Sequence, residues 1–517
     1  MNKNIKKQIS GLTLLMFLCT GCDKQVKIPQ TYIECTDSLY LYPDYKNIII
    51  PSNIAPLNFT IDNGAEKYIV SLKGQNGQEL LTESDQNLIQ FNPEKWRELL
   101  KQTIGTKIKV QIYGYNKKQW EKYKSYSLSV AEPIDSFLSY RLIEPGYELY
   151  RQLGLYQRNL TTFDVSPIYE NNKVYDDNNN HCVNCHNYQN YQTENMLFHV
   201  RAAHGGTIIA DKEKIKKIII KHDSILSSGV YPSWHPNHKW IAFSTNNTGQ
   251  VFHIKHKEKV EVLDLSSDLL FYDAEQNEVF NILKTDNSFE TFPCWSPDGK
   301  QLYYCVAEPE NLANIPDSLK RDFITKNYNQ LFYNIKVLDF NEKEKTFGIP
   351  KMVVDCTSQK KSASVPKISP NGDFLLYTLA DYGQFHIWHK SADLWVKDLK
   401  NDSTYALTET NSKDVDSYHT WSSNGRWIVF SSRRDDGNYT RIYIAYFDQN
   451  GQGHKAFLLP QKDPKENILL LKSYNVPELT TDALKWTDSD FKTVIYNDQG
   501  INADYKGRIK TDSEEDK

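Results

Sequence analysis

The sequence predicts a mostly β protein in which a propeller of stacked sheets follows a smaller β-sandwich. Three observations lead to this fold class. The chain of 517 residues exceeds the size of one ordinary domain. Aromatic residues make up 13%, which suits pleated, half-buried surfaces. A strand, turn and strand motif also recurs four times after residue 230. We therefore expect a modular chain built mainly from strands.

The charge balance excludes one class of partner. Lysine and arginine number 61 and aspartate and glutamate 65, which gives a formal net charge of -4. Nucleic-acid-binding proteins carry an excess of positive charge toward the phosphate backbone. We therefore expect no nucleic-acid partner.

The amino terminus has the layout of a secretory signal. Lysines precede an apolar run at 9–18, which is too short to span a bilayer. The sequence Leu-Cys-Thr-Gly-Cys at 18–22 resembles a bacterial lipobox. This resemblance implies a signal peptide over 1–21, acyl chains on Cys22 and a polar tether over 22–40. We therefore expect a periplasmic or surface lipoprotein of the cell envelope, anchored in the outer membrane.

The segment 41–135 is predicted to form the sandwich. Short apolar runs alternate there with polar turns such as 74–77, and about a hundred residues of this kind fit an immunoglobulin-like or fibronectin type III-like domain. The predicted role of this domain is spacing or docking.

A haem attachment motif lies in the segment 136–204, which we expect to connect the sandwich to the propeller. Cys182-Val183-Asn184-Cys185-His186 has the CxxCH pattern of c-type cytochromes. In that pattern two thiols bond to the haem vinyl groups and the adjacent imidazole binds the iron. The sequence thus predicts covalent haem c on Cys182 and Cys185, with His186 as an iron ligand. The predicted export of the chain agrees with this motif, because covalent haem attachment happens outside the cytoplasm.

Two other interpretations of the motif remain open. The two cysteines could form a local disulfide, or they could bind zinc together with His181 and His186. A redox CxxC is expected to open a helix after a strand, whereas this one lies in an asparagine-rich stretch. The sequence also lacks the second CxxC that structural zinc sites often use. Elsewhere, Cys294 and Cys305 could pair or remain buried free thiols.

The second axial ligand of the iron decides the chemistry. The nearby candidates are Met196, His199 and His204. Methionine would raise the reduction potential and histidine would lower it, while an open position would admit a small ligand. Each of the three side chains could instead serve packing or local hydrogen bonding.

The recurring motif predicts the propeller. Its four copies are 231–243, 292–304, 365–377 and 418–430. Proline restricts φ before the turn in three copies, Asp-Gly or Asn-Gly forms the turn in three copies, and an apolar strand follows in all four. The large residue at one position of each copy should fill the space between neighbouring sheets: Trp234, Trp295, Ile368 and Trp421. Because an isolated hairpin cannot bury that residue, the copies should stack radially.

This motif resembles the TolB-type propeller repeat. The resemblance implies a β-propeller, which we place at 205–475. The four copies, one further blade at 206–221 and one blade closed by the two ends give a count of about six blades. We expect the charged end of the C-terminal segment 476–517 to be disordered. Together with the CxxCH motif, the chain is similar to secreted bacterial TolB-like lipoproteins. Such propellers serve varied functions, and no GxSxG motif of an α/β-hydrolase occurs in the sequence.

The leading functional hypothesis is an exported, lipid-anchored monohaem c-type cytochrome that transfers electrons to a redox or envelope protein partner. One alternative is a non-enzymatic envelope protein whose propeller binds another protein and whose CxxC is structural. The other is a haem enzyme that acts on a small oxidant. No catalytic residues are identifiable from the sequence, which leaves open whether the protein is an enzyme.

Overall fold

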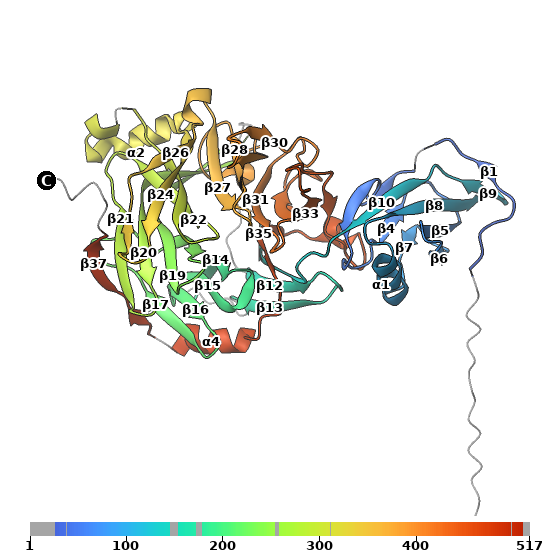
Figure 1. The fold of residues 1–517 in the computed structure, drawn as a ribbon, viewed down its shortest axis with the longest axis horizontal. Helices are drawn as coiled ribbons and strands as arrows, with labels where there is room; N and C mark the ends of the chain where they lie inside the picture. Colours follow the sequence, from blue (N-terminus) through green and yellow to red (C-terminus); the bar gives the residue numbers. More distant parts are fainter. Residues whose placement is uncertain are drawn as a thin grey trace, which may run out of the picture.

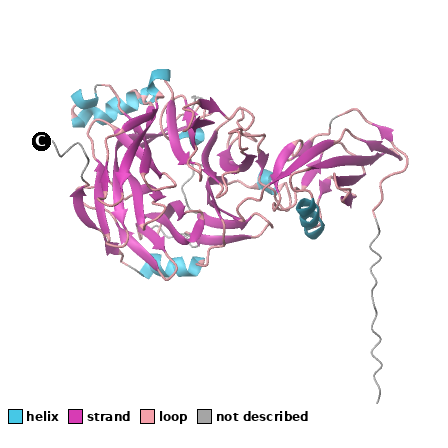
Figure 2. Cartoon of the chain, viewed as in Figure 1, coloured by secondary structure: helices cyan, strands magenta, loops and turns pink. Residues whose placement is uncertain are grey.

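The computed structural model describes residues 26–37, 39–144, 153–171, 178–253, 258–310, 312–497 and 499–509. The predicted signal peptide, Cys22 and the charged end 510–517 lie outside these residues. The described chain is mostly strand, as predicted, with few helices (Figure 2). It forms a small domain next to a larger one (Figure 1). None of its described helices is long and apolar enough to cross a membrane.

The small domain is the predicted two-sheet sandwich. Its larger sheet has the order β1-β9-β8-β10-β3, with β5 and β6 added through β8. These strands are β1 (Ile33–Glu34), β3 (Ile48–Pro51), β5 (Lys67–Gly74), β6 (Glu79–Ser84), β8 (Lys107–Asn116), β9 (Gln119–Lys122) and β10 (Tyr126–Ala131). The smaller sheet consists of β2 (Leu41–Tyr42), β4 (Phe59–Ile61) and β7 (Leu88–Ile89). Strand β1 lies inside the segment expected to be only a tether.

One helix in the sandwich was not predicted. Helix α1 (Pro93–Gln102) begins after Asn92, whose side chain accepts hydrogen bonds from two backbone amides of the first turn. Asparagine at the N-cap followed by proline at the first helical position is a recognised start signal. Trp96 anchors the helix, because its indole is buried and donates a 2.9 Å hydrogen bond to the Ile54 carbonyl.

The large domain is a β-propeller, as predicted. Six units of four or more strands can be counted in the described residues. The first blade consists of β35 (Ser473–Thr480), β11 (Phe137–Ile143), β12 (Gly154–Asn159) and β13 (Val165–Glu170). The second consists of β14 (His181–Gln189), β15 (Gln192–Ala202), β16 (Gly206–Ala210) and β17 (Ile215–Ile219). The third consists of β18 (Val230–Trp234), β19 (Trp240–Phe252), β20 (Val260–Asp273) and β21 (Glu278–Leu283).

The other three blades follow the same order. The fourth blade consists of β22 (Phe289–Trp295), β23 (Gln301–Ala307), β24 (Tyr333–Asn341), β25 (Thr346–Phe347) and β26 (Lys351–Val354). The fifth consists of β27 (Ser362–Ile368), β28 (Phe374–Ala380), β29 (Asp393–Asp398) and β30 (Thr404–Ala406). The sixth consists of β31 (Asp416–Trp421), β32 (Trp427–Ser432), β33 (Arg441–Tyr446) and β34 (Phe457–Leu458). The helices between strands are α2 (Asp317–Lys326), α3 (Glu466–Leu469) and four short 3-10 turns, η1 (Leu312–Asn314), η2 (Tyr328–Gln330), η3 (Thr357–Gln359) and η4 (His386–Trp388).

The ring of blades is closed. The innermost strands contact one another in the order β35, β14, β18, β22, β27, β31 and back to β35. Strand β35, from the end of the chain, pairs antiparallel with β11, from the start of the propeller. The first blade therefore joins both ends of the domain, and this closure leaves only the outer strands as edges.

The domain boundaries differ from those expected. The segment 136–204 is not a connector, because it contains the three outer strands of the first blade and the two inner strands of the second. The propeller also extends beyond residue 475, since β35 ends at Thr480. The CxxCH motif lies on β14 rather than in a loop. The CxxCH motif is consequently part of the propeller itself.

The large residue of each repeat packs as predicted. Trp295 is 5% exposed and lies in a core cluster with Phe271 of the preceding blade. Trp421 is 1% exposed and contacts the cluster that includes Leu394 of its preceding blade. Because each side chain fills the space between two blades, neighbouring blades stabilise one another.

The C-terminal segment wraps around the outside of the first three blades. Helix α4 (Asp488–Asn497) packs against β13 and β17. Strand β36 (Ile501–Asn502) then pairs in parallel with β17, and β37 (Asp504–Arg508) pairs in parallel with β21. Figure 1 shows β37 in dark red along the outer edge of β21. These short strands cover edges that would otherwise be open.

The sandwich and the propeller share a core. One apolar cluster contains residues of both, including Trp96 of the sandwich and Trp427 of the last blade. The Trp427 indole donates a 3.1 Å hydrogen bond to the Glu132 carbonyl, and the Ser423 amide donates one of 2.7 Å to the Asp135 carboxyl. The two domains are therefore fixed against each other.

Candidate functional site

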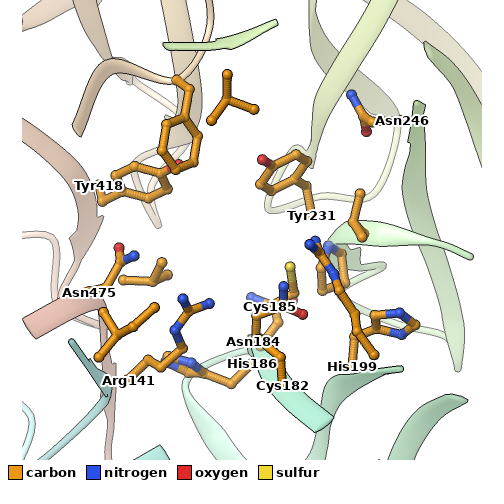
Figure 3. A pocket seen from close by; sticks show the side chains of 18 of the residues that line it. Arg141, Cys182, Asn184, Cys185, His186, His199, Tyr231, Asn246, Tyr418 and Asn475 are labelled. Carbon is orange, nitrogen blue, oxygen red and sulfur yellow. The ribbon is translucent and has the colours of Figure 1, made fainter. Parts of the chain in front are cut away.

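A cavity of about 1250 Å³ lies where the inner strands of the blades meet. Its wall includes residues of all six innermost strands. Small-molecule and cofactor sites usually occupy about 300–1,000 Å³, so this cavity can hold a large ligand. Figure 3 shows Tyr231 and Tyr418 on opposite sides of it, with the Cys185 sulfur directed inward.

A ring of residues with a left-handed backbone conformation shapes this cavity. Each innermost strand has one non-glycine residue with φ between 48° and 55°, and the strand pairing shifts next to it: Cys185, Tyr231, Phe292, Val365, Tyr418 and Val476. All six line the cavity. Positive φ is uncommon for such side chains, and its sixfold repetition identifies a β-bulge that belongs to the fold.

This bulge explains where the CxxCH motif sits. Cys185 occupies the left-handed position that Tyr231 and Phe292 occupy in other blades. His186 then occupies the position of Pro232 and Pro293. The motif is therefore a variant of the propeller repeat, with a thiol and an imidazole replacing an aromatic ring and a proline. The same substitution of histidine for proline occurs at His419.

Both thiols of the motif are free. Cys182 is 8% exposed, Cys185 is half-buried, and the structure places no disulfide between them or between Cys294 and Cys305. Burial raises the pKa of Cys185 above its ordinary value, so its thiol is protonated at neutral pH. Both cysteines line the cavity.

His186 is buried and neutral. Its side chain is 1% exposed, and neither ring nitrogen forms a hydrogen bond of good geometry with a residue that the structure describes, although the backbone of Ser139 and of Val476 lies close enough to act on its pKa. Burial, reinforced by the Arg141 charge, lowers its pKa to about 3. A neutral imidazole with unpartnered nitrogens can bind a metal ion, whereas an unpaired buried polar group otherwise costs free energy.

Glu478 lies beside this imidazole. One of its carboxyl oxygens is 4.0 Å from His186 Nε2, but His186 is neutral at pH 7, so the contact is not an ion pair. The other oxygen accepts a 2.9 Å hydrogen bond from the Asn187 amide and a 3.0 Å bond from the Tyr188 backbone. Burial raises the pKa of Glu478 to about 7. These contacts fix the backbone that follows the motif.

The structure separates the three candidates for the second axial ligand. His199 is 4% exposed on β15, opposite Asn184 of β14, and lines the cavity. Burial lowers its pKa to about 3, so it is also neutral. Met196 instead packs in the apolar core of the second blade. His204 lies away from the cavity wall, and its Nε2 is 3.0 Å from the Asn179 side chain.

The zinc interpretation lacks a ligand set. His181 is buried on the other face of β14, where its Nε2 contacts the Tyr169 hydroxyl at 2.6 Å and its Nδ1 the Asn179 carbonyl at 2.8 Å. Across the described chain, no three His, Cys, Asp or Glu side chains are grouped so that they could bind a metal ion.

The cavity wall is rich in positive charge. Its described residues include five cationic side chains and two carboxyl groups: Arg141, Arg201, Lys221, Lys367 and Arg433 against Glu144 and Glu478. When the side-chain oxygen of Asn184 faces Arg201, the guanidinium donates two hydrogen bonds to that oxygen, at 2.9 and 3.1 Å. Arg141 Nε is buried without a partner among the described atoms. This wall suits an anionic group.

Sequence reasoning missed Arg141 and Arg201 as site residues. Arg141 reaches the cavity only because β11 and β35 close the ring, and a pairing between residues so far apart leaves no local pattern. Arg201 could have been found, because it lies two residues after His199 and therefore on the same face of a strand.

Comparisons with known proteins assign no family. No family model matches the chain, and no curated protein matches its sequence. Solved structures show only distant likeness, with TM-scores near 0.3. A prolyl endopeptidase matches with 10% identity and a TM-score of 0.34, over 62% of this chain and 42% of its own. This chain therefore spans less than half of that protein.

Two other solved structures are matched over nearly their whole length. The periplasmic gluconolactonase of Pseudomonas aeruginosa shows 11% identity and a TM-score of 0.34, over 63% of this chain and 97% of its own. The propeller domain of the Trilobed protease from Pyrococcus furiosus shows 10% identity and a TM-score of 0.33, over 76% and 98%. The propeller assignment rests on the sheet order and the closed ring of inner strands.

Proposed function

We propose that this protein is an exported monohaem c-type cytochrome that holds its haem inside the propeller and transfers electrons. The observation that carries the proposal is the convergence of two free thiols and one neutral imidazole, which has no hydrogen bond of good geometry to a described residue, on the wall of a single large cavity. Covalently attached haem supplies reversible one-electron transfer when bound.

The donor set fits this cofactor. Cys182 and Cys185 would hold the haem through thioether bonds, and His186 would bind the iron. The imidazole needs no proton loss at neutral pH, because burial already keeps it neutral. Burial within the ring of blades also excludes water from this nitrogen.

His199 is the proposed second axial ligand. It is the one candidate of the three that lines the cavity, and it is neutral for the same reason as His186. Two imidazole ligands would give a lower reduction potential than an imidazole and a thioether. The proposal therefore favours electron transfer over binding of a small oxidant.

The positive wall supports the same proposal. Haem carries two carboxylate groups, and Arg141 and Arg201 form no ion pair with any residue that the structure describes. A guanidinium pairs well with a carboxylate through two parallel hydrogen bonds. These arginines would orient the cofactor and offset its negative charge.

The test is covalent retention of haem. The chain should be produced with the periplasmic machinery that matures c-type cytochromes, extracted with acid and acetone, and examined by absorbance. The haem band is expected to stay with the protein. A variant with Cys182→Ser and Cys185→Ser should lose the band, and the matched control with Cys294→Ser and Cys356→Ser, two buried cysteines elsewhere, should keep it.

The ligand assignment has its own test. His199→Ala should change the spectrum of the reduced protein, whereas Met196→Ala and His204→Ala should leave it unchanged. A spectral change in Met196→Ala alone would contradict the assignment. A protein without haem under maturation conditions would favour the alternative of a protein-binding propeller, in which the CxxC is structural.

A further inference from the structure

An exposed apolar loop lies outside the cavity. It comprises residues 467–472, which end helix α3 and lead into β35. Ile468, Leu469 and Leu471 are 59%, 74% and 66% exposed, among the largest exposures of any apolar side chain in the described chain. The neighbouring Asn467 is 3% exposed and Leu470 packs against the core. The loop thus directs three aliphatic side chains into solvent.

A buried arginine holds this apolar loop in place. Arg441 of β33 is 2% exposed, and its guanidinium donates 2.8 Å hydrogen bonds to the carbonyls of Asn467, Leu470 and Lys472. A buried charge is costly unless its hydrogen bonds are satisfied. Three of the hydrogen bonds of this guanidinium go to the backbone of one surface loop. The exposure of its aliphatic side chains is therefore built into the fold.

A small excess of positive charge borders the apolar loop, because Lys462, Lys465 and Lys472 stand against Asp463 and Glu466, which leaves a net charge of +1 over 462–472. Lys462 and Lys465 are exposed just before α3, and neither forms an ion pair with a residue that the structure describes. The Lys462 carbonyl accepts a 2.9 Å hydrogen bond from the Asn58 side chain of the sandwich. This contact places the region at the junction of the two domains, where Figure 1 draws the orange-red end of the propeller beside the sandwich.

We propose that the apolar loop inserts into the surface of a lipid bilayer that contains anionic lipids. Aliphatic side chains beside lysines match the boundary between acyl chains and negatively charged headgroups. Three side chains are too few for a stable protein interface, which uses about 20–30 residues on each side. They are sufficient for shallow insertion, and the inference does not depend on haem or on the cavity.

The test uses the full mature chain with Cys22→Ala, so that no acyl chain can contribute to binding. Sedimentation with vesicles of phosphatidylcholine and phosphatidylglycerol should recover the protein, and vesicles of phosphatidylcholine alone should recover less. The variant I468S/L469S/L471S should lower the partition coefficient about tenfold or more. K462Q/K465Q should weaken binding only to the anionic vesicles, and added salt should reproduce that effect.

The matched control is I104S/V165S/I349S, which removes three other aliphatic side chains that are 52%, 47% and 59% exposed. This control should bind like the parent chain, and the melting temperatures of all variants should agree because every substitution is on the surface. Equal vesicle binding by parent and I468S/L469S/L471S, or no binding by the parent, would overturn the proposal. Concentration-dependent dimerisation that the triple variant abolishes would overturn it in favour of a contact between copies.

Discussion

His186 and His419 occupy the same position in two blades but differ in their hydrogen bonds. Both follow a left-handed residue on an innermost strand, and burial lowers the pKa of each to about 3. The His419 nitrogens lie 3.2 Å from the Leu376 carbonyl and 3.4 Å from the Thr378 hydroxyl. The His186 nitrogens lie near the backbone of Ser139 and Val476 but form no hydrogen bond of good geometry with a described residue. The hydrogen bonds of His419 are therefore the better formed of the two.

This difference predicts unequal costs of substitution in the haem-free protein. His419→Ala should reduce the free energy of unfolding by about 1–2 kcal/mol more than His186→Ala, because it leaves buried partners unsatisfied. Urea unfolding of the two variants measures the difference. Equal losses would mean that His186 is hydrogen-bonded after all.

A buried carboxyl group predicts a pH effect on stability. Burial raises the pKa of Glu290, which is 2% exposed, from 4.5 to about 7. The stability that this shift contributes is complete below pH 4.5 and is lost as the pH rises through 7. Glu290→Gln should therefore gain stability relative to the parent between pH 4.5 and pH 8, on the order of 3 kcal/mol.

Thermal unfolding at several pH values would measure this gain. Glu275→Gln, at an exposed position in the turn before β21 of the preceding blade, is the control and should follow the parent. If the stabilities of Glu290→Gln and the parent changed with pH by the same amount, the result would contradict a raised pKa of Glu290.

The sequence predicted the centre of the candidate site better than its surroundings. CxxCH is a local motif, and Cys182, Cys185 and His186 do line one cavity. His199 was predicted on a level with Met196 and ahead of His204, because proximity in sequence does not say which face of a strand a residue occupies. Arg141 depends on ring closure, which no local pattern encodes.

At the scale of elements, turn chemistry decided which strands could be predicted. The four repeats were found through their proline and Asn-Gly or Asp-Gly turns. Strands β14 and β15 were missed because Asn190 and Tyr191 form the turn between them, with φ of 50° and 62°. Tyrosine at positive φ is uncommon, so this hairpin carries no recognisable signal. For β35 the signal was present, since Val476-Pro477-Glu478-Leu479 has the form of Val365-Pro366-Lys367-Ile368.

Two turn glycines predict a graded effect. Gly299 and Gly372 have φ of 73° and 78° in equivalent turns. A Cβ at Gly372 would meet open space, whereas one at Gly299 would collide with the His235 ring. Gly372→Ala should lower the free energy of unfolding by about 1 kcal/mol, because of backbone strain alone. Gly299→Ala should cost about 1–3 kcal/mol more because of overpacking.

Chemical denaturation of both variants tests this order. A smaller loss for Gly299→Ala than for Gly372→Ala would show that the His235 ring moves aside freely.

At the scale of the whole molecule, the two domains form one folding unit. Their cores join in a single cluster, and Trp427 is fully buried at the junction. Composition and repeats identified both domains, but the boundary at residue 205 was wrong by five strands, which belong to the first two blades, since the repeat motif is weakest where the chain enters the ring. A shared core also implies that neither domain reaches its full stability alone.

The shared core predicts a single unfolding transition. Calorimetry of the parent chain should show one cooperative peak. Trp427→Ala should lower the free energy of unfolding by about 3–5 kcal/mol and destabilise the sandwich together with the propeller. Two separate peaks for the parent would contradict a joint core.

The central claim is that haem is bonded to the propeller through Cys182 and Cys185. Mass spectrometry of the matured protein and of its proteolytic fragments tests this claim most directly. The fragment that contains both cysteines should carry the mass of one haem and no free thiol. Recovery of that fragment with two free thiols or a disulfide, from cells that mature other c-type cytochromes, would contradict the claim.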